Sequence, residues 1–153
     1  MGETTIMDVY VREILRKKGN SVLTIDPNAT VFEAIASMTK ENVGSIVVTE
    51  GTSIVGIFTE RDYLRRIALR RRPPKKTPIR EVMTDEVVTV GPTTTVEHCM
   101  AMMTNYRCRH LPVVEDGTLN GIISIGDCVK HLSRKAMTRV QTLEEYISGR
   151  YPA

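Results

Sequence analysis

One short motif occurs twice in the sequence, and its residue types could bind a sugar phosphate. Gly-Ile-x-[Thr/Ser]-x-x-Asp runs from Gly56 to Asp62 and again from Gly121 to Asp127. An ionised Asp accepts two hydrogen bonds from adjacent hydroxyls such as those of a ribose, while a Thr or Ser hydroxyl and the free amides of a helix N-terminus can meet a phosphate. Each charge-assisted bond of this kind contributes about 1.5–3 kcal/mol. The motif therefore fits a nucleoside phosphate.

A purely structural interpretation of the same residues is also available. Thr59-x-x-Asp62 and Ser124-x-x-Asp127 are close to a capping box, in which a hydroxyl and a carboxylate satisfy free amides at the start of a helix. The glycine, which lets another group approach the strand, and the recurrence of the motif favour a ligand instead. Both interpretations stay open at the level of the sequence.

The motif recurs because the chain contains two copies of one unit. Shifted by 65 residues, Val22–Asp62 aligns with Val87–Asp127 without a gap, and 13 of the 41 positions are identical. Each copy shows the hydrophobic pattern of strand, helix, strand, strand and helix. We expect an α/β (α+β) fold in which two β-α-β-β-α copies pack about a pseudo-two-fold axis. Such packing leaves two clefts at the junction, where a ligand should bind.

The predicted elements follow the repeat. Strands are expected at 22–25, 45–49 and 54–58 in the first copy, and at 87–90, 111–115 and 119–123 in the second. Capping boxes at Thr30-x-x-Glu33 and Thr94-x-x-Glu97 predict the helix starts. A short leading helix precedes each copy, because Val11–Leu15 and 79–83 have similar sequences. We divide the chain into residues 1–78, the first repeat with its leading helix and a basic linker, and 79–153, the second repeat with a C-terminal helical extension.

A basic belt, residues 61–80, links the copies. It holds nine Lys and Arg and one acid, Asp62, in a chain whose net charge is +3. Such a belt could bind nucleic acid or an acidic partner, but it contains one aromatic residue, Tyr63, and so offers few surfaces on which bases could stack. A solvated helix and linker is the alternative.

Composition and motifs exclude several classes of protein. The apolar runs are far shorter than the ~18 residues that a membrane span needs, and we expect no targeting peptide, because the first residues carry acid where such a peptide carries base and no apolar core follows. Three Cys without a C-x-x-C motif indicate reduced, intracellular thiols. Of these, Cys108 and Cys128 could be exposed and redox-sensitive. No nucleophile–base pair or metal-ligand spacing is evident, so we expect no enzyme activity and no intrinsic metal.

The end of the chain predicts an oligomer. Apolar residues recur at helical spacing from Val129 to Ile147, so that a helix over about 127–148 would be too long for one small copy to cover. We expect a homodimer that this helix partly seals, with packing inside the monomer as the alternative.

These features together resemble the cystathionine-β-synthase (CBS) domain pair, also called a Bateman module. The resemblance extends from about Val9 to Lys130. It is carried by the repeat itself and by the segments NVGSIVV (42–48), GIFTERD (56–62), RHLPVV (109–114) and GIISIGD (121–127). The chain is most similar to stand-alone two-repeat proteins of bacteria and plant organelles, which implies a disc-like homodimer in the cytoplasm or the mitochondrial matrix.

The resemblance implies a non-catalytic sensor that binds an adenosine nucleotide and modulates a partner. AMP is the first candidate, with ADP, ATP, NAD(H) and S-adenosylmethionine as alternatives, and magnesium would arrive only on a nucleotide. The partner could be a regulated enzyme or a thioredoxin-type protein; nucleic acid and membrane are not expected. The implied nucleotide-binding residues are Gly44, Ser45, Ile57, Thr59, Arg61, Asp62, Arg109, His110, Ser124, Ile122 and Asp127.

The two implied sites are chemically unequal. Asp62 and Asp127 would hold ribose, and Thr59 and Ser124 would contact ribose or phosphate. Basic residues before the second strand commonly take the phosphate, and these are Arg109 and His110 in the second copy. The first copy has Gly44 and Ser45 there, and instead carries Arg61 inside its motif. We therefore expect the Asp127 site to bind phosphate better, although His110 could also be a packing residue.

Overall fold

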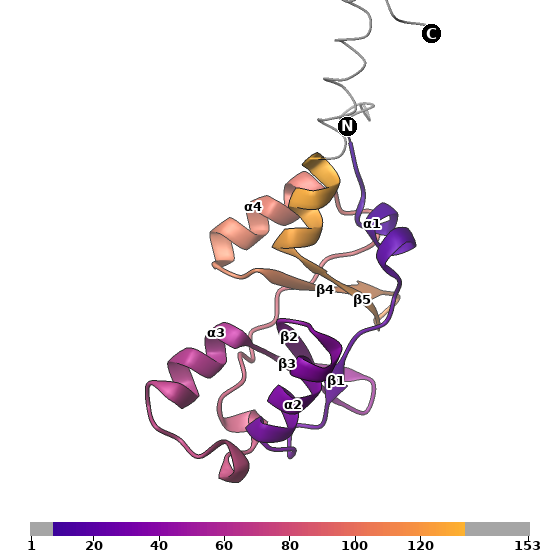
Figure 1. Cartoon of the computed structure of the whole chain (residues 1–153). Helices are drawn as coiled ribbons and strands as arrows, with labels where there is room; N and C mark the ends of the chain where they lie inside the picture. The colour runs from indigo at the N-terminus through magenta and orange to yellow at the C-terminus, as the bar shows by residue number, and fades with distance from the viewer. Residues whose placement is uncertain (1–7, 134–153) are drawn as a thin grey trace, which may run out of the picture.

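The computed structural model describes residues 8–133, and each copy of the repeat forms one lobe (Figure 1). The first lobe is built on β1 (Thr24–Ile25), β2 (Ser45–Glu50) and β3 (Ser53–Thr59), with β1 parallel and β3 antiparallel to β2. Its helices are α2 (Val31–Glu41) and α3 (Glu60–Tyr63), and α3 continues as a π-helical turn over Leu64–Ala68. The predicted strand–helix–strand–strand–helix order is confirmed.

The second lobe repeats this order with a shorter sheet. It contains α4 (Val96–Tyr106), the antiparallel pair β4 (His110–Glu115) and β5 (Thr118–Ser124), and a helix that begins at 125 and is described to 133. The strand expected at 87–90 is reduced to one parallel bridge between Val90 and Val113. In the first copy the amide of Val47 donates to the carbonyl of Leu23, at 3.0 Å. Pro112 occupies the equivalent position of the second copy and has no amide hydrogen to donate, so the pairing is shorter.

The helix starts confirm one of the two expected capping boxes. Thr30 and Glu33 form the complete box at α2. The box expected at Thr94 is wrong, because Thr95 caps α4 and accepts a hydrogen bond from the amide of His98. Thr95 is the repeat equivalent of Thr30, but its third helical residue is a histidine, which provides no carboxylate.

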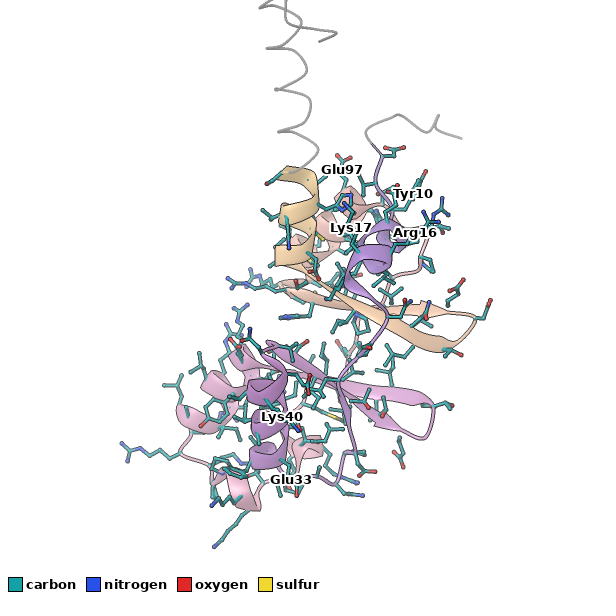
Figure 2. The ribbon with its side chains drawn as sticks, turned by 45° about the vertical axis from the view of Figure 1, so that its right-hand side comes forward. Tyr10, Arg16, Lys17, Glu33, Lys40 and Glu97 are labelled. Atoms are coloured by element: carbon teal, nitrogen blue, oxygen red, sulfur yellow. The ribbon has the colours of Figure 1, made fainter. Side chains whose placement is uncertain are left out.

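The leading segments are exchanged between the lobes. Helix α1 (Val11–Lys18) packs into the core of the second lobe through Val11, Ile14 and Leu15, and the turn Ile79–Glu81 packs into the core of the first lobe through Ile79. Figure 2 shows the result, with Arg16 and Lys17 of α1 in the same lobe as Glu97 of α4, away from Glu33 and Lys40 of α2.

The sequence predicts a leading helix before each copy but does not indicate the copy on which it packs. Three backbone hydrogen bonds recur at equivalent positions and hold each exchanged segment. Their donors and acceptors are Val96 to Val9, Val11 to Thr94 and Arg12 to Pro92 in the second lobe, and Val31 to Thr77, Ile79 to Ala29 and Arg80 to Pro27 in the first. The contacts are reciprocal, as a two-fold relation between the copies requires. The boundary between residues 78 and 79 divides the sequence into its two copies, but each lobe contains residues from both sides of it.

The motif glycines are explained by this exchange. A Cβ on Gly56 would lie 2.8 Å from Cγ of Met83, and a Cβ on Gly121 would lie 2.8 Å from Cδ2 of Leu15. Met83 and Leu15 are equivalent residues of the two leading segments. The close approach predicted from the glycines therefore occurs, but to the exchanged segment of the protein, so the glycines give no support to a ligand.

The predicted C-terminal helix over 127–148 lies mostly outside the described residues. Within residues 8–133, no helix has the length and apolar character needed to cross a membrane.

Candidate functional site

Both motifs form capping boxes at the start of a helix. In the first copy the amide of Asp62 donates to Oγ1 of Thr59 at 3.2 Å, and Oδ2 of Asp62 accepts from the amide of Thr59 at 3.0 Å. In the second copy the equivalent bonds join Asp127 to Ser124 at 3.1 and 2.9 Å. The structural interpretation of the motif is thus confirmed, and each carboxylate commits one oxygen to its own helix start.

Asp62 uses its second oxygen within the protein as well. Oγ1 of Thr84 lies 3.2 Å from Oδ1, and Nε of Arg66 lies 3.9 Å from the same oxygen. Arg66 also donates to the carbonyls of Val82 and Met83, at 2.9 and 2.8 Å. The residue Asp62 is only 8% exposed. This carboxylate therefore joins α3 to the exchanged segment 82–84.

Asp127 is more open, and a lysine from the other exchanged segment contacts it. Nζ of Lys18, the last residue of α1, lies 2.7 Å from Oδ2 of Asp127 and donates to the carbonyl of Ile122 at 2.8 Å. The side chains of Lys18 and Asp127 are 34% and 23% exposed. Among the described residues, no hydrogen bond reaches Oδ1 of Asp127. Burial alone would raise the pKa of Asp127, but hydrogen bonds from Lys18 and Ser124 and the charge of Lys18 lower it below 3.8.

His110 lies where the two lobes meet. A Cβ on Gly44 would be 3.4 Å from Nε2 of His110 and 3.5 Å from Oε1 of Glu60, so the imidazole of the second lobe packs beside both residues of the first. Burial lowers the pKa of His110 below 6.5, and the charge of Lys18 lowers it further, while Glu60 and Asp127 act in the opposite direction. The imidazole is therefore mainly neutral at pH 7.

The remaining predicted residues divide into two groups. Arg109 is exposed beside His110, and its carbonyl accepts from the amide of Ile125 at 2.9 Å, as the carbonyl of Gly44 accepts from Glu60 at 3.1 Å. Nη1 of Arg61 reaches the carbonyl of Arg107 at 3.5 Å and so crosses between the lobes. Ser45 and Ile57, in contrast, are buried in the first sheet.

Ile57 has little backbone to offer a ligand. Its amide and carbonyl exchange two hydrogen bonds of 2.9 Å with Thr84. In the second copy the carbonyl of Ile122 accepts from Lys18 instead. We call the group of Lys18, Ser124 and Asp127 the Asp127 corner. The structure thus brings Gly44, Arg61, His110 and the Asp127 corner to the junction, whereas Asp62, Ile57 and Ser45 are enclosed in the first lobe.

Sequence reasoning missed Lys18 and Thr84, the groups that contact the two motif carboxylates from the exchanged segments. Lys18 is the last residue of α1 and Thr84 follows the turn Ile79–Glu81, but nothing local indicates that each leading segment crosses to the other lobe. The alignment of Val11–Leu15 with 79–83 was the available signal, because equivalent segments can exchange places.

The basic belt is largely occupied by contacts within the chain. Arg72 pairs with Glu81 at 2.6 Å, Arg80 donates to Asn28, and Lys75 lies 4.8 Å from the ring centroid of Phe32. With Arg61 and Arg66, five of its nine cations contact this protein's own groups. The belt therefore fastens the linker to the fold.

The thiols and possible metal ligands give no further site. Cys128 is fully buried, so the expectation that it is exposed is wrong; Cys99 is also buried and Cys108 is half-buried. Burial raises the pKa of Cys99 to about 12 and that of Cys128 to about 11. Within residues 8–133, no group of three or more His, Cys, Asp or Glu could hold a metal ion.

Comparison with known proteins identifies the family. The model of the CBS domain matches residues 11–69 and 79–134, and the chain therefore belongs to the CBS-domain family. The chain is 38% identical over 160 residues to the mitochondrial CBS domain-containing protein CBSX3 of Arabidopsis thaliana, covering 99% of this chain and 78% of that protein.

Two solved structures support the same assignment. A putative signal-transduction protein with CBS domains from Burkholderia ambifaria is 42% identical, with a TM-score of 0.78 over 81% of this chain and 93% of that one. A CBS domain protein from Pyrobaculum aerophilum, solved in complex with AMP, is 26% identical, with a TM-score of 0.70 over 82% of this chain and 99% of that one. The expected fold of two β-α-β-β-α CBS repeats is confirmed.

Proposed function

We propose that this protein is a non-catalytic regulatory module that binds an adenosine nucleotide, AMP first, at the junction of its two repeats. The AMP complex of the Pyrobaculum aerophilum relative supports the ligand class. The observation that carries the proposal is the Asp127 corner, where an ionised carboxylate keeps Oδ1 without a hydrogen-bond partner among the described residues. Oδ1 can accept from a ribose hydroxyl, and Arg109, His110 and Lys18 provide positive or protonatable groups for a phosphate.

We assign different roles to the two motif carboxylates, Asp62 and Asp127. Asp62 is enclosed by Thr59, Thr84 and Arg66, so its substitution should disturb the fold more than ligand binding. Asp127 is half-buried and is the proposed ribose ligand. Thr59, Arg61 and Gly44 would line a weaker first site, without the buried Ser45 and Ile57, and Ser124 and Ile122 would line the stronger second one.

Calorimetric titration with AMP and ATP tests this proposal. Asp127→Ala should lose about tenfold or more in affinity for AMP, because a charge-assisted hydrogen bond to ribose contributes about 1.5–3 kcal/mol. Asp62→Ala, checked for folding by circular dichroism, should lose less. Equal losses in both variants would refute the inequality of the sites. Native mass spectrometry of the protein purified from cells would then identify the bound ligand and its stoichiometry.

A homodimer is the assembly that we propose for this module. Leu64 and Val129 occupy equivalent positions on the second helix of the two copies, and both are exposed, at 58% and 48%. Exposed apolar side chains at symmetry-equivalent positions are typical of an interface between copies. Sedimentation of Leu64→Asp and of a chain truncated before Ala136 tests the two candidate interfaces. A dimer that neither change weakens would overturn this assembly.

A ligand can regulate a partner only if it binds two arrangements of the module with different affinity. We place that change at the junction of the lobes, where His110 meets Gly44 and Glu60. A regulated enzyme or thioredoxin-type protein would respond to it.

The mitochondrial relative supports an intracellular location, the cytoplasm or the mitochondrial matrix. Binding of nucleic acid or an acidic partner through the basic belt stays a prediction, which a filter-binding salt titration would measure.

A further inference from the structure

Lys18 occupies the part of the Asp127 corner that a ribose would need. Its ammonium lies 2.7 Å from Oδ2 of Asp127, the same oxygen that caps the helix through the amide of Ser124. A ribose presents two adjacent hydroxyls, and a carboxylate binds both most strongly when its oxygens are open. A sugar must therefore share this carboxylate with Lys18 or displace the ammonium.

The position of Lys18 is set by the fold. Leu15 is buried against Gly121, where its side chain anchors α1 across β5, and Gly19 ends the helix at a φ of 97° directly after Lys18. The carbonyl of Ile122 holds the ammonium from a second side, at 2.8 Å. Asn20 adds a hydrogen bond of 3.0 Å to the carbonyl of Asn120. The ammonium is thus held at the end of β5, beside Asp127, the residue proposed to bind the ribose.

The first copy has no such cation on its exchanged segment. Aligned through the leading segments, Lys18 is equivalent to Glu86, and the group that contacts Asp62 is the neutral hydroxyl of Thr84. Arg66, the cation near Asp62, belongs to the first copy's own helical segment and is bound to backbone carbonyls. Among the described residues, only at the Asp127 corner does the exchanged segment place a cation against the motif carboxylate.

We propose that Lys18 makes the Asp127 site selective for phosphorylated nucleosides over bare nucleosides. In the empty site it competes with the ribose for Asp127. When a nucleotide binds, the phosphate offers the displaced ammonium a new anionic partner, whereas adenosine offers none. Lys18 thereby couples recognition of the sugar to the presence of a phosphate. This inference rests on the proposed function, since it assigns a specificity-determining residue to the same site.

The test compares AMP with adenosine by calorimetry on the full chain. Lys18→Met should raise the affinity for adenosine and lower the affinity for AMP, so that the ratio of the two affinities falls by about tenfold or more. Lys17→Met is the matched control, because Lys17 carries the same charge on the neighbouring, exposed position of α1 (Figure 2). Lys18→Arg, which keeps the positive charge, should retain most of the wild-type ratio of AMP affinity to adenosine affinity. In an Asp127→Asn background, Lys18→Met should still lower the affinity for AMP but should no longer raise the affinity for adenosine, because the ammonium no longer has a carboxylate to compete for.

The outcomes distinguish a failure of the proposed role of Lys18 from a failure of the proposed nucleotide-binding function. If the wild type binds both compounds and Lys18→Met leaves their ratio unchanged, or weakens both equally, the role of Lys18 is refuted while nucleotide binding stands. The role is also refuted if Lys17→Met changes the ratio as much as Lys18→Met. If the wild type binds neither compound nor any other adenosine nucleotide, the proposed function itself fails. Thermal unfolding of each variant should show that the fold is retained, because the side chain of Lys18 is 34% exposed.

Discussion

Asp62 and Asp127 occupy equivalent positions in the two copies, yet their surroundings differ. Asp62 is 8% exposed and its two oxygens accept hydrogen bonds from Thr59 and Thr84. Asp127 is half-buried, and its contacts with Ser124 and Lys18 use one oxygen. The same motif thus forms a structural link in the first lobe and a more open corner in the second.

The exchanged segments cause this difference. In the first lobe Thr84 pairs with Ile57 through two backbone hydrogen bonds, as a short strand would, and its hydroxyl reaches Asp62. In the second lobe the equivalent segment is the helix α1, which reaches the end of β5 through the flexible side chain of Lys18. Duplication therefore preserved the scaffold, whereas the leading segment determines whether each carboxylate is enclosed.

The first prediction concerns whether the lobes unfold separately, and it has the largest expected effect. All three cysteines lie in the second copy, and Cys99 and Cys128 are buried. A pKa of about 12 for Cys99, against an ordinary value of 9.0, leaves about a thousandfold less thiolate at pH 8, and burial slows alkylation further. We expect the half-buried Cys108 to react first under native conditions.

The reciprocal exchange predicts one cooperative unfolding transition. Alkylation of Cys99 and Cys128 should therefore follow the same urea dependence as the loss of helical circular dichroism over the whole chain. Labelling of these thiols at a urea concentration where most of the helical signal remains would show that the second lobe unfolds independently.

The second prediction tests the exchange by overpacking. Gly56→Ala places a Cβ against Met83 and 3.1 Å from the carbonyl oxygen of Thr84, and should destabilise the protein by about 1–3 kcal/mol. Met83→Ala should relieve part of this cost, so a double-mutant cycle in urea should show a favourable coupling. Gly91→Ala is the control, because its Cβ would meet only the carbonyl of Val114 at 3.8 Å. Strict additivity of Gly56→Ala and Met83→Ala would contradict the contact.

The third prediction separates structural from binding roles. Asp62→Ala leaves the partly buried groups of Thr59 and Thr84 without their acceptor, and should cost about 2 kcal/mol of stability. Asp127→Ala should cost about 1 kcal/mol, because the released ammonium of Lys18 can reach water. Chemical denaturation measures both values. A larger loss in Asp127→Ala would reverse the comparison between the copies.

Most of the fold was predictable because the repeat constrains two segments at once. The apolar spacing of α2 and α4, the hairpins and the helix starts at Thr59 and Ser124 all follow from local pattern and turn chemistry. The helix cap at Thr94 was misplaced by one residue because a Glu at the right spacing outweighed the alignment with Thr30. The first strand of the second copy was overestimated because its loss depends on Pro112, which lies in the partner strand.

The site was predictable only in part. From the repeat and the family resemblance, the sequence predicts that Asp127, Ser124, Arg109 and His110 belong to one site. It could not place Lys18 there, because this contact joins residues that are 109 positions apart and depends on the exchange of the leading segments. Local patterns carry no information on such long-range packing.

The fourth prediction uses His110, at the junction of the lobes. Its pKa in the folded state is lowered below 6.5, by burial first and then by the charge of Lys18. In the unfolded state the imidazole binds a proton more readily, so the free energy of unfolding should fall as the pH drops below about 6.5. His110→Gln should remove this dependence between pH 7 and 5, whereas His98→Gln, on the exposed face of α4, is the matched control.

Nucleotide binding should oppose this effect. A phosphate beside the imidazole favours its protonated form, so saturating AMP should flatten or reverse the loss of stability toward pH 5. The lowered pKa of Asp127 does not interfere, because a carboxyl whose pKa lies below 3.8 loses its charge only at lower pH. Calorimetry near pH 6 in buffers of different ionisation enthalpy should therefore show proton uptake on AMP binding, and His110→Gln should abolish it. Uptake that persists in this variant would place the phosphate away from His110, and the Asp127 corner would then hold the sugar without the imidazole.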